Sequence, residues 1–305
     1  MGAGLPRRPT AVSLAQEINI MPFRVVAHLN KNYRHRISQM WENYCLVSHY
    51  AVALHQPVKT GQIAVPTLPD IFGRGEQTLT ISRVLSSLGS LTQRHHGYVT
   101  FVYVVSAFEQ CIADTVSCVY LRQPQLMDVV NPNQDTSTQD LKLLKIVVNA
   151  TTWAEIIDQV AEERVRSIFY GNPMDVFLKD KCRMSLGSWF TDNCSDEMTV
   201  LREIIARRNV VVHNDGRVDR KYLRETKAST AIETKLDVDF DYMRTVFQIV
   251  IQVAGCFSAL VLRNLFKQKL KGFLRETLTR YEGQQPPNIP APREIMRRGV
   301  SKGEE

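Results

Sequence analysis

The sequence predicts an all-α fold, in which a helical bundle is preceded by additional N-terminal helices. Apolar residues recur at the three- and four-residue spacing of helices along most of the chain. Residues typical of helix starts and stops bound these segments. No two segments of alternating apolar residues flank a tight turn, so we expect no β-hairpin. Of the 305 residues 44% are hydrophobic and 23% charged, which is enough apolar content for a buried core.

The N-terminal third is predicted to contain two helices outside the main domain. Residues 1–22 are predicted to be a flexible leader, followed by an N-terminal helical extension over 23–96. The first helix of this extension covers 24–55 and the second covers 78–94. Proline and glycine punctuate 56–76, which we interpret as a loop. The expected apolar stripe of the first helix contains Val25, Leu29, Ile37, Trp41 and Leu46.

The main helical domain is expected over 97–282. It opens with a largely buried helix that runs from residue 97 and ends before Pro124. The polar stretch 131–140 is predicted to be a surface loop, and a short helix covers 140–149. The later part contains a long helix over about 239–280.

Helix boundaries in this domain follow from capping residues. Thr152 and Glu155 form a capping box that opens a helix with Trp153 on its inner side. Pro173 suits the first turn of another helix. Ser195 is an N-cap, followed by two acidic residues that suit the positive end of the helix dipole. Gly216 is the expected stop of that helix.

The tail after the main domain, residues 283–305, is rich in proline and charge and is predicted to be disordered.

The chain is basic, and its positive charge is concentrated in two segments. The formal net charge is +7. Residues 263–280 hold six basic residues against one acidic residue, and residues 201–228 hold eight against four. Such patches attract phosphate backbones without regard to sequence. From charge alone we favour solvated helix faces for both segments, and a site for a polyanionic partner is the alternative.

Compartment signals favour a cytoplasmic protein. The six cysteines form no CxxC pair and are typical of reduced thiols. The 18 uncharged residues between Arg244 and Arg263 are long enough to span a bilayer. Gln248 and Gln252 interrupt them at helical spacing, however, so we favour a soluble core helix and expect no membrane contact. An interaction or membrane-associated protein built on this helix stays open as an alternative.

The sequence contains none of the common metal, nucleotide or serine-hydrolase motifs. His95 and His96 have no partners at ligand spacing. We therefore expect no metal and no cofactor.

The segment Arg208-Asn209-Val-Val-Val-His213 is the strongest candidate site. Arg208 offers a permanent forked cation that suits phosphate oxygens, and His213 exchanges a proton near neutral pH. On a helix the two lie about 140° apart, whereas Asn209 and His213 share a face. One chain alone would therefore build only a loose site. The alternative is a helix-end histidine beside a surface arginine.

The segment RRNVVVHNDGRVDRKYL, residues 207–223, resembles the signature of the HEPN superfamily, in its RiboL-PSP-HEPN and abortive-infection branch. In that family an arginine followed by a polar residue precedes a histidine by four to six residues, as Arg208, Asn209 and His213 do here. Arg207 also satisfies the spacing. Upstream, Glu109 matches an acidic position of the family's opening helix, and the resemblance covers about 97–280.

The resemblance implies a HEPN-like helical bundle that forms a homodimer. It also implies that the protein is a metal-independent endoribonuclease of a toxin–antitoxin, phage-defence or RNA-processing system. His213 would act as general acid or base, Arg208 would hold the scissile phosphate, and Asn209 would orient the histidine or contact RNA. Arg207 and Asn214 would have supporting roles. Glu109 would pair with Arg208 or His213, or form a purely structural ion pair.

The resemblance also implies an antitoxin or regulatory protein as a partner. The alternative function is a non-catalytic HEPN-like module that binds RNA, a nucleotide or a protein.

Overall fold

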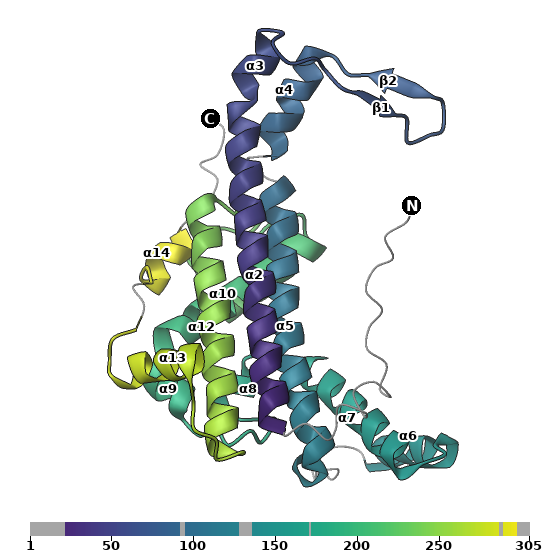
Figure 1. Cartoon of the computed structure of the whole chain (residues 1–305), viewed down its shortest axis with the longest axis vertical. Coiled ribbons are helices and arrows are strands. Elements are labelled where there is room, and N and C mark those ends of the chain that lie inside the picture. Colours follow the sequence, from purple (N-terminus) through teal and green to yellow (C-terminus); the bar gives the residue numbers. More distant parts are fainter. Residues whose placement is uncertain (1–21, 92–94, 128–135, 171, 287–288, 298–305) are drawn as a thin grey trace. The chain divides into compact units, whose positions relative to one another are not determined.

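A computed structural model describes residues 22–91, 95–127, 136–170, 172–286 and 289–297 (Figure 1). Within these ranges the fold is all-α, as predicted, with one two-stranded sheet. The predicted leader falls almost wholly outside the described residues. The helices are α2 (Pro22–Ala53), α3 (His55–Lys59), α4 (Ile81–Ser90), α5 (His96–Arg122), α6 (Thr136–Asn149), α7 (Trp153–Tyr170), α8 (Asp175–Leu178), α9 (Trp189–Asn193), α10 (Ser195–His213), α11 (Arg220–Thr226), α12 (Phe240–Asn264), α13 (Gly272–Glu282) and α14 (Pro292–Arg297).

The chain divides into two compact units, each of which combines three segments. The first unit consists of Met1–Tyr33, Glu109–Ser195 and Gln252–Pro287. The second consists of Arg34–Phe108, Asp196–Ile251 and Asn288–Glu305. Both units therefore draw residues from either side of position 97. The division into an N-terminal extension and a main domain at that position stays a prediction.

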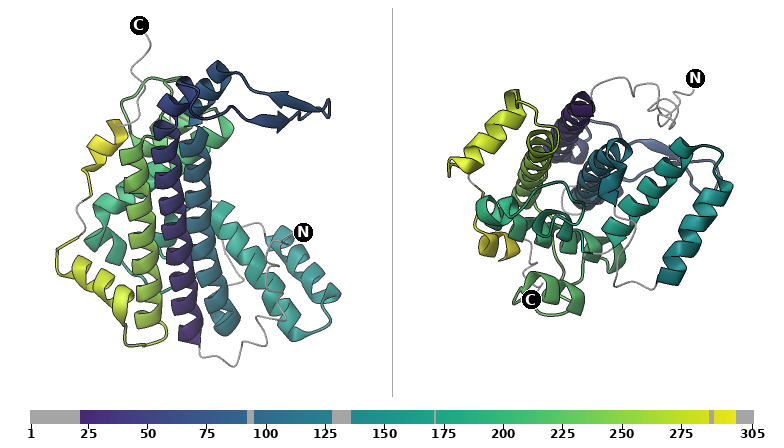
Figure 2. Two further views of the ribbon diagram at one scale, coloured as in Figure 1. Left: turned by 45° about the horizontal axis from the view of Figure 1, so that its top comes forward. Right: turned by 90° about the horizontal axis from the view of Figure 1, so that it is seen from below.

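In the second unit α2, α5 and α12 pack together. The Nη2 atom of Arg36 donates to the carbonyl oxygen of Ala107, 3.3 Å away, and so joins α2 to α5. The ring of Trp41 meets that of Phe247 edge-on, with 5.1 Å between centroids, and joins α2 to α12. Figure 2 shows the three helices side by side. The residues of α2 that are buried within this unit are Ile37, Tyr44 and Ala51.

The first predicted helix is confirmed by α2, although its predicted stripe is wrong at Leu46, which is 53% exposed. The second predicted helix is confirmed by α4, which begins later than expected. Thr80 caps it, because its hydroxyl oxygen accepts from the backbone N–H of Arg83 at 3.2 Å.

The prediction that the chain contains no β-hairpin is wrong. Strands β1 (Thr67–Pro69) and β2 (Glu76–Thr78) pair antiparallel within the segment expected to be a loop (Figure 1). The hydroxyl groups of Thr67 and Thr78 lie 2.8 Å apart across the pair. Every residue of both strands is exposed. The hairpin was missed because strands without a buried face lack the apolar alternation that identifies them in a sequence.

The first unit is built from parts of α2, α5 and α12 together with α6–α9 and α13. Asn30 on α2 is buried, and its side-chain amide donates to the carbonyl oxygen of Ala254 and to the hydroxyl oxygen of Ser258, both at 3.2 Å. Because these acceptors lie on α12, the amide fixes one helix against the other. The hydroxyl of Tyr120 donates to the carbonyl oxygen of Cys182 at 3.2 Å, which joins α5 to the segment after α8.

The capping predictions hold better than the burial predictions. The hydroxyl oxygen of Thr152 accepts from the backbone N–H of Glu155 at 3.2 Å, at the start of α7. Trp153 was expected on the inner side of this helix but is 73% exposed. The predicted loop 131–140 extends too far, because α6 begins at Thr136. Residues 131–135 of this predicted loop lie outside the described part of the chain.

The single helix expected over 239–280 is two helices, α12 and α13. The break falls at 265–271, where Lys267 has a left-handed φ of 51° and Gly272 follows with a φ of 49°. The predicted disordered tail is wrong in part, because α14 forms within it and buries Ile295.

Two helices, α5 and α12, are long and apolar enough to cross a membrane by length and composition alone. In α12 the most apolar window is 83% buried inside the protein, as in the core helix of a soluble protein.

Candidate functional site

Helix α10 carries the candidate motif at its C-terminal end. Its middle is surrounded by protein, and its side chains reach the surface again after Val210. The helix ends at His213, and the backbone N–H of Gly216 then donates to the carbonyl oxygen of Val210 at 3.1 Å. Gly216 has a φ of +76°, and an added Cβ would lie 2.9 Å from the hydroxyl oxygen of Tyr98. Only glycine fits this stop without strain.

The structure brings Arg208 and Asn209 together at this end. Both are half-buried, and the Nη1 atom of Arg208 donates to the Oδ1 atom of Asn209 at 3.0 Å. His213 is exposed one turn further on. Within the part of the chain that the structure describes, no hydrogen bond joins the His213 ring to either residue. The side chain of His213 is therefore accessible from solvent, and neither motif partner holds its ring by a hydrogen bond.

Arg207, unlike the half-buried Arg208, is fully enclosed by protein. Its side chain is 0% exposed, and its Nε atom forms an ion pair with Glu203 at 2.7 Å. Its Nη1 atom donates to the backbone carbonyl of Asp237, also at 2.7 Å. The guanidinium carbon lies 4.0 Å from the centroid of the Tyr242 ring. Burial opposes the charge of Arg207, but Glu203 and Tyr242 outweigh it and raise its pKa above the ordinary value. Arg207 thus has no surface from which to touch RNA.

Glu203 is the centre of this buried arrangement, which we call the Glu203 cluster (Glu203, Arg207, Tyr222 and Tyr242). The hydroxyl of Tyr222 donates to one carboxylate oxygen at 2.7 Å, and the hydroxyl of Tyr242 donates to the other at 2.8 Å. Burial, followed by the charge of Glu203, raises the pKa of both tyrosines. Through this cluster α10 is joined to α11 and α12. The cluster therefore fixes the helix that carries Arg208 and His213.

The sequence analysis missed Glu203, Tyr222 and Tyr242. One signal was present, because Glu203 stands four residues before Arg207 on a helix whose neighbouring positions are apolar. A charged pair at this spacing on a buried face needs further hydrogen-bond partners. The tyrosines that supply them are distant in sequence, so spacing alone could not identify them.

The turn after His213 is also fixed. The side-chain amide of Asn214 donates to the carbonyl oxygen of Arg217 at 2.6 Å, which places Asn214 in the turn itself. Asp215 and Lys235 form an ion pair at 3.1 Å. The backbone N–H of Leu236 donates to the carbonyl oxygen of Gly216 at 2.8 Å. Asn214 therefore stabilises the turn that ends α10. Its supporting role in a functional site stays a prediction.

Helix α11 adds basic side chains beside this end of α10. It packs against α10 through Tyr222, which is buried against Ala206 and Val210. The exposed basic residues of this segment are Arg217, Arg220, Lys221, Arg224 and Lys227. The segment that follows His213 is therefore rich in exposed positive charge, although Lys221 pairs with Glu225 at 4.0 Å.

Glu109 lies on α5 in the first unit, whereas Arg208 and His213 belong to the second. It is half-buried. Its pairing with either motif residue stays a prediction.

The described residues contain no group of three or more His, Cys, Asp or Glu side chains that could hold a metal ion. His95 contacts the hydroxyl of Ser90 at 2.8 Å, and His96 stacks on the ring of Tyr44 at 5.1 Å. All six cysteines are free thiols.

No family model matches the chain, and no curated protein and no solved structure is significantly similar to it. The assignment to the HEPN superfamily therefore stays a prediction from the sequence pattern.

Proposed function

We propose that the protein is a metal-independent endoribonuclease that cleaves RNA by attack of the ribose 2′-hydroxyl. The observation that carries this proposal is the exposed His213 at the firmly fixed end of α10, one turn beyond Arg208 and Asn209. The exposed basic side chains that follow it suit a phosphate backbone. The RNA would be cytoplasmic, in a toxin–antitoxin, phage-defence or RNA-processing setting.

The mechanism follows from the residue types. His213 removes the proton from the 2′-hydroxyl, whose oxygen attacks the adjacent phosphorus. The bond from phosphorus to the 5′ oxygen breaks, and that oxygen takes a proton from a second histidine. Arg208 stabilises the charge that develops on the phosphate oxygens. The products are a 2′,3′-cyclic phosphate and a 5′-hydroxyl, and DNA is spared because it has no 2′-hydroxyl.

The geometry of one chain supports a site completed by a second copy. Arg208 and His213 project about 140° apart on α10, so a single phosphate cannot easily touch both. In a two-fold dimer, His213 of one protomer would face Arg208 of its partner, and two histidines would supply the base and the acid.

A second candidate function is a non-catalytic RNA-binding module. The observation that favours it is the hydrogen bond from Arg208 to Asn209. This bond engages the amide oxygen of Asn209 in a half-buried position, and no hydrogen bond among the described residues orients the ring of His213.

Cleavage of a mixed RNA pool in EDTA tests the proposal. Wild type is compared with Arg208→Ala and His213→Ala, and with matched controls in which an exposed residue of the same type outside this segment is replaced, Arg83→Ala and His55→Ala. We expect both motif variants to lose cleavage, both controls to retain it, and wild-type products to end in a 2′,3′-cyclic phosphate. Absence of cleavage by a folded, RNA-binding wild type would favour the non-catalytic module instead.

A further inference from the structure

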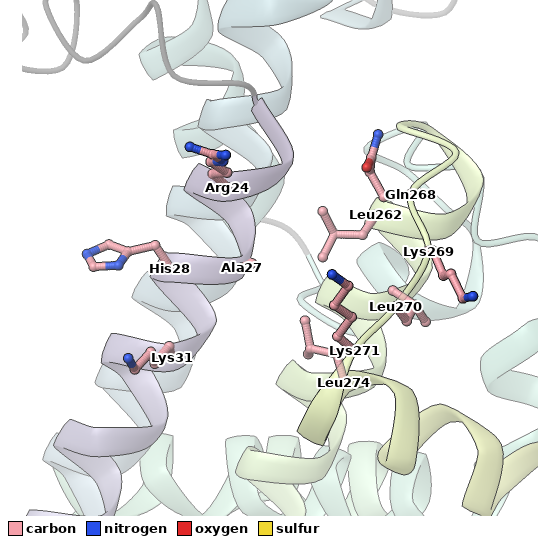
Figure 3. A pocket seen from close by; sticks show the side chains of 10 residues that line it. All are labelled: Arg24, Ala27, His28, Lys31, Leu262, Gln268, Lys269, Leu270, Lys271 and Leu274. Carbon is pink, nitrogen blue, oxygen red and sulfur yellow. The ribbon is translucent and has the colours of Figure 1, made fainter.

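The first unit contains a pocket of about 660 Å³ with strongly basic walls (Figure 3). One wall is the start of α2, and the other is the segment 265–271 that joins α12 to α13. The basic residues that line the pocket are Arg24, His28, Lys31, Lys269 and Lys271. Between them lies an apolar floor that includes Leu262 and Leu274.

The wall formed by α2 presents its basic side chains in a row. Arg24, His28 and Lys31 are four and three residues apart, so they lie on one face of the helix. Figure 3 shows them one after another along α2, with the segment that carries Lys269 and Lys271 on the other side of the pocket. The buried hydrogen bonds of Asn30 to α12 fix this wall in place.

The opposite wall is also held by specific contacts. The backbone N–H of Gln268 donates to the carbonyl oxygen of Leu262 at 3.0 Å, and its side chain donates to the carbonyl oxygen of Phe266 at 3.0 Å. At the far end Gly255 permits a close approach of α13, since an added Cβ there would lie 2.8 Å from the Cε1 atom of Phe273. The segment between the two helices is therefore tied down at its start and at its end.

No acidic side chain in the pocket neutralises its positive charge. No acidic residue lines it, and Arg24, Lys31, Lys269 and Lys271 form no ion pair with any residue that the structure describes. The neighbouring Arg263, by contrast, is neutralised by Glu282 at 2.6 Å. Positive charge that no acidic side chain neutralises, on both sides of a pocket, attracts anions.

We propose that this pocket binds the phosphate backbone of single-stranded RNA. The inference rests on the proposed function and adds a docking site in the first unit, whereas Arg208 and His213 lie in the second. A pocket of about 660 Å³ is larger than one phosphate requires, so it has room for the ribose that adjoins the phosphate. Lysines bind phosphates as point charges, so the contact carries no sequence preference.

RNA fits this pocket better than an acidic membrane surface does. Peripheral membrane sites combine basic residues with exposed apolar side chains that enter the lipid. None of the large apolar residues that are exposed in the described ranges lines the pocket.

Binding of a short labelled oligouridine with 2′-O-methyl groups, which 2′ attack cannot cleave, tests the inference over a series of salt concentrations. The pocket variant is Lys31→Gln/Lys269→Gln/Lys271→Gln. The matched control is Lys267→Gln/Arg275→Gln/Arg280→Gln, which removes the same charge from exposed residues of the same unit that do not line the pocket. Circular dichroism and thermal unfolding check that both variants are folded.

We expect the pocket variant to lose about tenfold or more in affinity at low salt. The slope of log K against log salt should fall by about two, because each lost phosphate contact on a single strand removes about 0.7. The control should change both values much less. Equal losses in the two variants would overturn the inference, because they would indicate diffuse attraction. Unchanged RNA binding with lost binding to phosphatidylserine vesicles would overturn it in favour of a membrane site.

The outcome is separable from the test of the proposed function. If Arg208→Ala and His213→Ala cleave RNA as fast as wild type while the pocket variant loses RNA binding, the ribonuclease mechanism fails and the docking site stands. If those two variants lose cleavage while the pocket variant binds as wild type, the docking site alone is refuted.

Discussion

Replacement of Glu203 by alanine tests how much the Glu203 cluster contributes to the stability of the folded protein. Glu203 and Arg207 are both 0% exposed and lie 2.7 Å apart. In Glu203→Ala the guanidinium of Arg207 remains buried without its counter-charge, and the hydroxyls of Tyr222 and Tyr242 lose their acceptor. Breaking a buried pair in this way costs about 3–5 kcal/mol.

That loss is large compared with the stability of a folded protein, which is about 5–15 kcal/mol. Urea denaturation followed by circular dichroism measures it, and we expect the midpoint to fall by about 1–2 M. An exposed glutamate on α2 gives the control, since Glu42→Ala should change stability by less than about 0.5 kcal/mol.

A double variant separates charge from packing. Glu203→Leu/Arg207→Met removes both charges and keeps most of the volume, so it should be considerably more stable than Glu203→Ala. The reasoning would be refuted by a Glu203→Ala protein whose stability lies within about 1 kcal/mol of wild type. It would be refuted equally by a double variant less stable than the single one.

Further predictions concern the helix ends and one half-buried histidine. Gly216→Ala should lose about 1–2 kcal/mol in urea denaturation, because alanine is strained at a φ of +76° and its Cβ would crowd Tyr98, and Tyr98→Phe in the same chain should recover part of the loss. Thr152→Ala should cost about 1 kcal/mol by removing the cap of α7, and an unchanged midpoint would contradict the role of that cap. Burial lowers the pKa of His96 in the folded chain, so its neutral form stabilises the fold fully above the unfolded value of about 6.5, and this stability is lost as the pH falls through the folded pKa. His96→Gln should therefore flatten the loss of stability in that acidic range, and a slope equal to that of wild type would count against the assignment.

The helices could be predicted from the sequence wherever an apolar face is buried. The spacing of apolar residues predicted α2 and α5, and capping residues predicted the start of α7 and the end of α10 at Gly216. The β-hairpin and the break between α12 and α13 were not predicted. Both depend on local backbone geometry rather than on burial, and Lys267 in a left-handed conformation leaves no mark in an apolar pattern.

Of the candidate site, the sequence could predict only residues that are close to one another in the chain. Spacing gave two candidate arginines before His213, and the structure separates them, because Arg207 is buried in the Glu203 cluster and Arg208 reaches Asn209. The partners of Arg207 stand on two other helices, so they could be found only after the fold was known. The basic pocket could not be predicted either, because Arg24 and Lys271 are far apart in the sequence and line the same pocket only in the folded chain.

The exposed hairpin has a consequence for how the chain is cut. Its strands bury no side chain, and at the tip Ile71 is 90% exposed and Phe72 is 73% exposed. A two-stranded ribbon without a covered face is marginally stable at best, and it opens at little cost compared with the helices on either side. Among the residues that the structure describes, trypsin should therefore cut the native protein first after Arg74. The two fragments should stay associated until denaturant is added, because the helices that hold them together do not depend on the hairpin.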